Sequence, residues 1–178
     1  VFEAGLVDGI DRGFLAPFDY RGLADTIDYQ AQKERVWRNG RFDLEQVGEL
    51  ASTQERMRKT WSEWQAQPGT KSLVFCCSVK HARSVTGWLS DRGVRIEAVH
   101  AATPSEDRAT CIERLQSGAL DALAVVDLFN EGVDIPALDR VVMLRPTESP
   151  VIFLQQLGRG LRKHDATKRL RVLDFVGN

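Results

Sequence analysis

The sequence predicts a three-layer α/β domain with a mostly parallel sheet, and three features of the chain indicate it. Apolar strand-like runs alternate with helical patterns after Pro68-Gly69, which is typical of βαβ units. Ser72–Ser78 is a continuous apolar run, as expected of a strand that is buried on both faces. Thr103-Pro104 and Ser149-Pro150 each place a capping residue before a proline, a common way for a helix to begin.

The first part of the chain has a different pattern. The run Phe14–Tyr20 is apolar but interrupted by a proline, which predicts an edge strand or an extended connector. Leu44–Trp64 carries apolar residues three and four positions apart, which predicts a helix. We expect its charged residues to form a solvated face: Glu55, Arg56, Arg58 and Lys59. The predicted organisation is therefore a connector and helical segment over 1–70, followed by the α/β domain over 71–178.

Within the α/β domain the predicted elements follow one another regularly. Strands are expected over 72–78, 94–100, 121–126, 140–144 and 170–175. Helices are expected over 81–91, from 103 to about 116 and from Ser149 onward. Because ligands of an open parallel sheet bind beyond the carboxyl ends of its strands, the loops after these strands are the expected place for chemistry.

Composition excludes several classes of protein. The 178 residues hold 24 Lys and Arg against 25 Asp and Glu, so the formal net charge is −1. A protein with this balance cannot bind nucleic acid through bulk positive charge, and any such contact must be local. No apolar stretch is long enough to span a bilayer. Because the chain begins with Val1, we expect it to be a piece of a longer protein.

The cysteines and tryptophans are expected to have structural roles. Three cysteines make no disulfide framework, which favours a reducing, cytoplasmic setting. Cys76 and Cys77 have no second ligand pair at a suitable spacing, so core packing is expected there and no metal site. His100 is either a buried imidazole or a relay towards a nucleotide. Packing, not base stacking, is also expected of the four tryptophans: Trp37, Trp61, Trp64 and Trp88.

The segment after Ser149-Pro150 has an unusual combination of glycine and arginine, Gln155-Gln-Leu-Gly-Arg-Gly-Leu-Arg162. A glycine inside a helix costs about 1 kcal/mol relative to alanine, so the two here should be offset by something else. Arg159 and Arg162 share one helical face, and Gln155 lies one turn earlier on it. Two converging guanidinium groups suit a polyanion such as a triphosphate. The alternative is a helix end whose dipole favours cations.

This pattern, Gln-x-x-Gly-Arg-x-x-Arg, resembles motif VI of superfamily-two helicases. Asn130–Pro136 resembles their motif V, and Leu73–Ser78 resembles the strand of motif IV. The order and spacing of these motifs agree over residues 72–178. The sequence around motif V is most similar to that of bacterial DEAD/DEAH-type helicases related to the translocating subunits of type I and type III restriction enzymes.

The resemblance implies a second RecA-like domain, which is the C-terminal motor domain of an ATP-dependent helicase or translocase. In that family the first lobe carries the phosphate-binding loop and the metal-binding acidic motif, and this sequence contains neither. ATP with Mg²⁺ is therefore expected to be held mainly by a first lobe that this chain lacks, and the chain alone is expected to be inactive.

The resemblance also implies roles for individual residues. Arg162 would be the arginine finger on the γ-phosphate, with Arg159 and Gln155 as its catalytic neighbours. Gly132 and Asp134 would lie at the edge of the nucleotide, where a carboxylate can accept hydrogen bonds from the ribose. The alternative for Asp134 is a cap on the turn before the following Ile-Pro.

The expected partners are nucleic acid, with DNA favoured, and the N-terminal lobe of the same protein; no membrane contact is expected. Phosphate contacts are expected near strand ends and helix starts, from Ser78, Lys80, Thr103 and Asn130. For Ser78 and Thr103 the alternative is simple helix capping. Val126 stands where many family members have Thr, and Glu131 where many have Arg, so Asn130 or the loop backbone could take over contacts of motif V.

Two other functions remain open at this stage. One is a restriction-type translocase that moves along duplex DNA without unwinding it. The other is a nucleotide-binding or protein-binding module without motor activity. A dinucleotide-dependent enzyme is disfavoured, because no Gly-x-Gly-x-x-Gly follows the first strand of the α/β domain.

Overall fold

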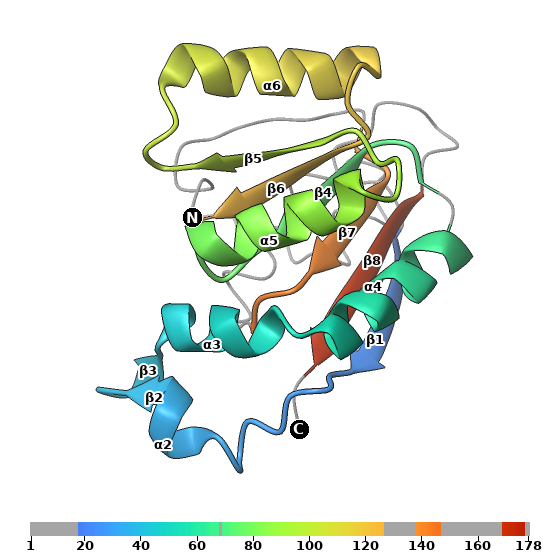
Figure 1. The fold of residues 1–178 in the computed structure, drawn as a ribbon. Coiled ribbons are helices and arrows are strands. Elements are labelled where there is room, and N and C mark those ends of the chain that lie inside the picture. The colour runs from blue at the N-terminus through green and yellow to red at the C-terminus, as the bar shows by residue number, and fades with distance from the viewer. Residues whose placement is uncertain (1–17, 68, 127–137, 147–168, 177–178) are drawn as a thin grey trace, which may run out of the picture.

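The computed structural model describes residues 18–67, 69–126, 138–146 and 169–176. In these ranges six strands form one sheet in the order β1-β8-β7-β4-β6-β5, and every neighbouring pair is parallel (Figure 1). The strands are β1 (Phe18–Ala24), β4 (Ser72–Phe75), β5 (Ile96–His100), β6 (Ala122–Val126), β7 (Arg140–Met143) and β8 (Leu170–Val176). The all-parallel pairing confirms the predicted sheet.

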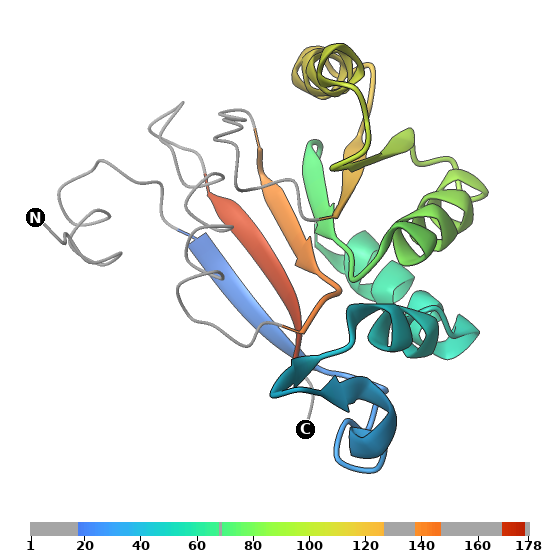
Figure 2. The ribbon, with the colours of Figure 1, turned by 90° about the vertical axis from the view of Figure 1, so that its left-hand side faces the viewer.

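Helices cover both faces of this sheet, which makes three layers. Longer helices are α3 (Leu44–Ala51), α4 (Gln54–Ala66), α5 (Val79–Ser90) and α6 (Ser105–Ser117). A four-residue helix, α2 (Lys33–Val36), leads into a small antiparallel hairpin of β2 (Trp37–Arg38) and β3 (Arg41–Phe42). Figures 1 and 2 show that α2 and the hairpin lie at the end of the sheet to which the strand arrowheads of β1, β7 and β8 point.

Alternate residues along each central strand enter different cores, as the two-residue period of a strand requires. In β4, Val74 packs with α4 and α5, whereas Leu73 and Phe75 pack with Leu115 of α6. The neighbouring strands follow the same alternation, and nearly all of their side chains are buried. A sheet covered on both faces therefore explains why these strands appear in the sequence as continuous apolar runs.

The predicted helix over 44–64 is wrong in one respect, because the structure divides it into α3 and α4. Thr53 accepts a hydrogen bond from the backbone N–H of Arg56 and so begins a new helix. The predicted strand 72–78 ends at Phe75, since Ser78 begins α5. The edge position of β1 confirms the edge-strand interpretation of the run that ends at Tyr20; residues 14–17 lie outside the described ranges.

Two buried arginines hold α4 against the sheet. At the amino end of β7, Arg140 donates to the carbonyl oxygens of Trp64 and Gln67 at 3.0 and 2.8 Å, and to Ser72 Oγ at 2.9 Å. Its guanidinium lies 3.5 Å from the centre of the Trp64 ring, and burial lowers the pKa of Arg140 to about 10. The second arginine, Arg56, holds the other end of the helix at the carboxyl edge of the sheet.

Candidate functional site

The carboxyl edge of the sheet is organised around β4, which lies between β6 and β7. The segments that follow β6 and β7 therefore start on either side of the β4 end. These segments hold Asn130, Gly132 and Asp134 after β6, and Gln155, Arg159 and Arg162 after β7. All six residues lie outside the described ranges, so their predicted roles stay predictions. The described part of this edge consists of the start of α5, the turn after β5 and a cluster around Asp25 and Arg56.

Ser78 begins α5 directly beyond the end of β4. Its hydroxyl accepts the backbone N–H of His81 at 3.2 Å, and the residue is only 4% exposed. Helix α3 covers it, since a Cβ atom added to Gly48 would lie 2.9 Å from Ser78 Oγ. Ser78 is thus a helix cap in this arrangement, and a phosphate could reach its hydroxyl only if α3 moved away.

Lys80 lies in the first turn of α5 and points to solvent, with 74% of its side chain exposed. It forms an ion pair with Glu49 of α3 at 3.1 Å, and Glu49 also pairs with Arg35 of α2 at 3.1 Å. The hydrogen bond from Lys80 and its charge, together with those of Arg35, lower the pKa of Glu49. Exposed pairs of this kind are weak, so a phosphate group could replace Glu49 as the partner of Lys80.

Thr103 lies in the turn after β5, and the predicted capping role is wrong in detail. The residue at the start of α6 is Pro104, which makes no side-chain cap. Thr103 instead closes a tight turn: its Oγ1 accepts the N–H of His100 at 3.0 Å, and its own N–H donates to the His100 carbonyl at 2.9 Å. Because β6 separates β5 from β4, Thr103 and Lys80 follow strands that are not neighbours.

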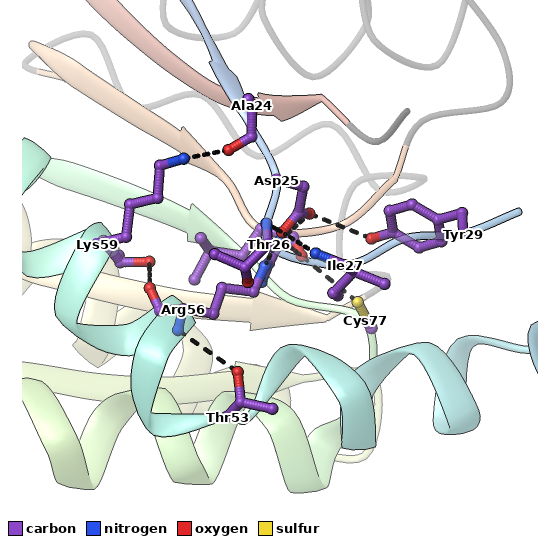
Figure 3. Close-up of polar contacts among 11 residues, drawn as sticks. Ala24, Asp25, Thr26, Ile27, Tyr29, Thr53, Arg56, Lys59 and Cys77 are labelled. Carbon is purple, nitrogen blue, oxygen red and sulfur yellow. Dashed lines mark hydrogen bonds and ion pairs between the residues drawn. The ribbon is translucent and has the colours of Figure 1, made fainter. Parts of the chain in front are cut away.

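A buried ion pair lies where β1, β4, β7 and β8 end. Arg56 of α4 donates from Nε and Nη2 to the two carboxylate oxygens of Asp25 at 2.7 and 2.9 Å, and both side chains are at most 1% exposed (Figure 3). Nη2 also donates to the carbonyl of Leu144, which follows β7, at 3.1 Å. The Phe175 ring of β8 lies 5.1 Å from the guanidinium carbon.

Further hydrogen bonds are made to Asp25 and to the residue before it. Asp25 also accepts the hydroxyl of Tyr29 at 3.3 Å and the backbone N–H of Thr26 at 2.7 Å, and Lys59 donates to the carbonyl of Ala24 (Figure 3). Burial opposes the charged form of Arg56, but the hydrogen bonds and charge of Asp25 outweigh it and raise the pKa of Arg56. Arg56 therefore stays charged, and its hydrogen bonds tie the chain after β1 to α4 and to the end of β7.

His81 is buried beside this cluster. Its Nδ1 accepts the backbone N–H of Cys77 at 3.2 Å, and its Nε2 has no hydrogen-bond partner among the described residues. Burial, aided by the charge of Arg56, lowers the pKa of His81 to about 3, and burial raises the pKa of Cys77 to about 12. Both groups are neutral near pH 7, which suits packing and not acid–base chemistry. Across the described ranges no cluster of His, Cys, Asp and Glu could hold a metal ion.

One protein family, described as the helicase conserved C-terminal domain, matches residues 53–164 of this sequence. The matched range covers more than half of the chain. The chain belongs to this helicase C-terminal domain family. None of the helices described for this domain is long and apolar enough to cross a membrane.

Individual relatives agree with this assignment. IRC3 of Saccharomyces cerevisiae, named as an ATP-dependent helicase, is 26% identical over 99% of this chain, which spans 26% of the length of IRC3. A structure of an HsdR-subunit fragment, named for a type I restriction enzyme from Vibrio vulnificus, has a TM-score of 0.69 at 23% identity and covers 94% of this chain and 33% of its own. The DEAD-box protein SrmB of E. coli has a TM-score of 0.60 at 20% identity over 90% of this chain and 78% of its own. These folds confirm the RecA-like α/β architecture.

Part of the carboxyl edge of the helicase domain is built by residues for which the sequence pattern predicts another role. Arg56 was expected on a solvated helix face, and this is wrong, since it is fully buried, whereas Glu55 and Arg58 are exposed. No local signal could have revealed this, because the partner Asp25 lies 31 positions away. Packing was also expected of Trp37, but 39% of this residue is exposed. It lies on a hairpin, and the pair Asn39-Gly40 is a sequence signal for a hairpin turn.

Proposed function

We propose that the chain is the C-terminal motor domain of an ATP-dependent nucleic-acid helicase or translocase, with DNA as the expected substrate. The observation that carries this proposal is the family match over 53–164, because that range includes Gln155, Arg159 and Arg162. The sheet order supports it, since the segments that carry the predicted nucleotide contacts begin beside the end of β4. The buried free cysteines Cys76 and Cys77 accord with a reducing cytoplasm.

In this proposal ATP and Mg²⁺ are held mainly by the N-terminal lobe of the same protein. Our domain supplies the opposite wall, with Arg162 at the γ-phosphate beside Arg159 and Gln155. Gly132 and Asp134 lie at the edge of the nucleotide. A guanidinium group there offsets charge that develops during phosphoryl transfer, and closure of the two lobes drives movement along a strand.

Among the described residues, Lys80 supports a nucleic-acid contact most directly. Its ammonium group is exposed at the start of a helix, where the backbone dipole also favours an anion. Thr103 and Asn130 are the further proposed phosphate contacts. Ser78 could join them only after α3 moves away from the start of α5.

The experiment that tests the proposal is steady-state ATPase activity of Arg162→Ala in the protein that carries both lobes. Loss of an arginine finger lowers turnover on the order of a thousandfold or more, while nucleotide binding and melting stay near wild type. Arg162→Lys restores little, because an ammonium group lacks the planar fork of arginine. If Arg162 only stabilises a helix end, the Ala variant keeps its turnover and loses at most about 1 kcal/mol of stability.

A restriction-type translocase on duplex DNA is the second candidate, and the breadth of the HsdR likeness favours it. That fold match extends over 94% of the chain. A translocase of this kind displaces the third strand of a triplex without separating the duplex, whereas a helicase releases one strand of the duplex. Both assays use the two-lobed protein, and absence of nucleic-acid-stimulated ATP hydrolysis in it would leave only a non-motor binding module.

A further inference from the structure

The hairpin β2–β3 exposes an aromatic and cationic surface that the helicase motifs do not include. Its turn, Asn39-Gly40, has φ angles of 51° and 77°, the left-handed values that a two-residue type I′ turn requires. Residues 33–41 hold four cationic side chains against one carboxylate, although the whole chain has a net charge of −1. The net charge of the whole chain allows only local contacts with nucleic acid, and this local excess of positive charge could make one.

The hairpin is fixed to the domain through a row of aromatic rings. Trp37 packs edge-on against Phe42 with the ring centres 4.9 Å apart, and Phe42 packs against Tyr29 at 5.5 Å. Tyr29 is buried and donates to Asp25, so the row ends at the Asp25–Arg56 pair. Trp37, at the free end of the row, is therefore held in place while 39% of it faces solvent.

Two hollows flank this row. One, of about 290 Å³, has aromatic and aliphatic walls with a cation at the rim: Tyr29, Gln30, Lys33, Val36, Trp37 and Phe42. The other, of about 400 Å³, has both cations and carboxylates in its wall: Arg38, Asn39, Arg41, Phe42, Asp43, Leu44 and Glu45. An exposed ring beside cations is the arrangement that binds single strands, because bases stack on the ring and phosphates meet the charges.

The charges of the hairpin are available to a ligand. Lys33 and Arg41 are exposed and form no ion pair with any described residue, and Arg38 keeps 66% of its side chain exposed in a 3.5 Å contact with Asp43. Glu49 bridges Arg35, on the adjoining helix α2, to Lys80. Cations therefore recur between the proposed phosphate contact on α5 and the hairpin, with the carboxylate of Glu49 between Lys80 and Arg35.

We infer that the hairpin is a second contact for single-stranded nucleic acid, in which a base stacks on Trp37 and the flanking phosphates meet Lys33 and Arg41. This inference rests on the proposed function, because it assumes a nucleic-acid substrate, and it extends the strand path from Lys80 to the end of the hairpin. Stacking needs no particular base, so the contact is independent of sequence.

The test is a titration of the full chain with fluorescein-labelled (dT)20 and (U)20, followed by anisotropy at several salt concentrations. Trp37→Ala weakens binding about tenfold, whereas Trp37→Phe, which keeps a stacking ring, retains most of the affinity. Lys33→Gln with Arg41→Gln weakens binding and flattens the dependence of log K on log salt by about 1.4. The matched control is Arg58→Gln with Arg92→Gln, which removes two exposed cations elsewhere and leaves affinity unchanged.

The possible failures are distinguishable. If the wild-type chain binds either strand and the hairpin variants bind equally well, the hairpin inference is overturned while the proposed function stands. The exposed ring of Trp37 would then be a contact for another protein. If the wild-type chain binds neither strand, the hairpin inference is overturned, while the ATPase test on the two-lobed protein still decides the proposed function. Thermal melting of each variant separates loss of binding from loss of fold; equal affinities of Trp37→Ala and Trp37→Phe would also contradict stacking.

Discussion

Removal of Arg56 should destabilise the domain strongly, because the carboxylate of Asp25 would remain buried without its partner. The guanidinium makes three hydrogen bonds, two to Asp25 and one to the Leu144 carbonyl. Breaking one side of a buried ion pair costs about 3 to 5 kcal/mol. In a domain of this size that loss corresponds to a fall of roughly 6 to 20 °C in Tm.

The variant to measure is Arg56→Met, by urea unfolding and thermal melting at pH 7. Arg58→Met is the matched control, since Arg58 is exposed two positions away on the same helix and donates a hydrogen bond to Gln54; its change should stay within about 0.5 kcal/mol. Asp25→Asn in the Arg56→Met background should recover part of the loss, because it removes the unpaired charge but keeps an acceptor for Thr26. If Arg56→Met melts like Arg58→Met, the reasoning about the buried pair is refuted.

Two further predictions concern the contact between α3 and α5. Gly48→Ala should lower the free energy of unfolding by about 1 to 3 kcal/mol, because the new Cβ would overlap Ser78 Oγ. Gly87→Ala is the control and should raise the free energy of unfolding by up to about 1 kcal/mol, because the space around its Cβ is open. If urea unfolding shows changes of the same sign for both variants, this packing is contradicted. His81 has a pKa of about 3 in the folded protein and 6.5 in the unfolded chain, so the unfolded chain binds more protons between these pH values. The contribution of His81 to the free energy of unfolding is therefore fully present above pH 6.5 and is lost as the pH falls towards 3. Between pH 7 and pH 5 wild type should lose about 2 kcal/mol more than His81→Asn in urea unfolding, and parallel pH profiles would exclude a buried neutral imidazole.

The sequence was sufficient for those parts of the fold in which local pattern and tertiary environment agree. The strands near Val74 and Val142 are apolar because both faces of the sheet are covered, so their composition predicts their place. The division at Thr53 was missed because the apolar spacing continues across it, and a capping threonine is a weaker signal than a helical period.

The candidate site was less accessible to sequence reasoning for a physical reason. Arg56 and Asp25 meet only through the tertiary fold, and no helical or strand period links them. Ser78 was correctly given capping as an alternative, yet its cover by Gly48 of α3 depends on how two helices pack. The motif residues such as Arg162 were found from resemblance, and their geometry lies outside the described ranges.

The pairing of β1 with β8 has a consequence for how the protein is made. Tyr20 of β1 donates to Asp174 of β8, its contact across 154 positions of chain. At a synthesis rate of about 5 to 20 residues per second, β1 leaves the ribosome roughly 8 to 30 s before β8 exists. During that interval the first strand has no neighbour in the sheet, and the edge of β7 that β8 will occupy stays open. The described sheet is therefore completed only when β8 has been made, and the nascent chain is most exposed to aggregation just before that strand appears.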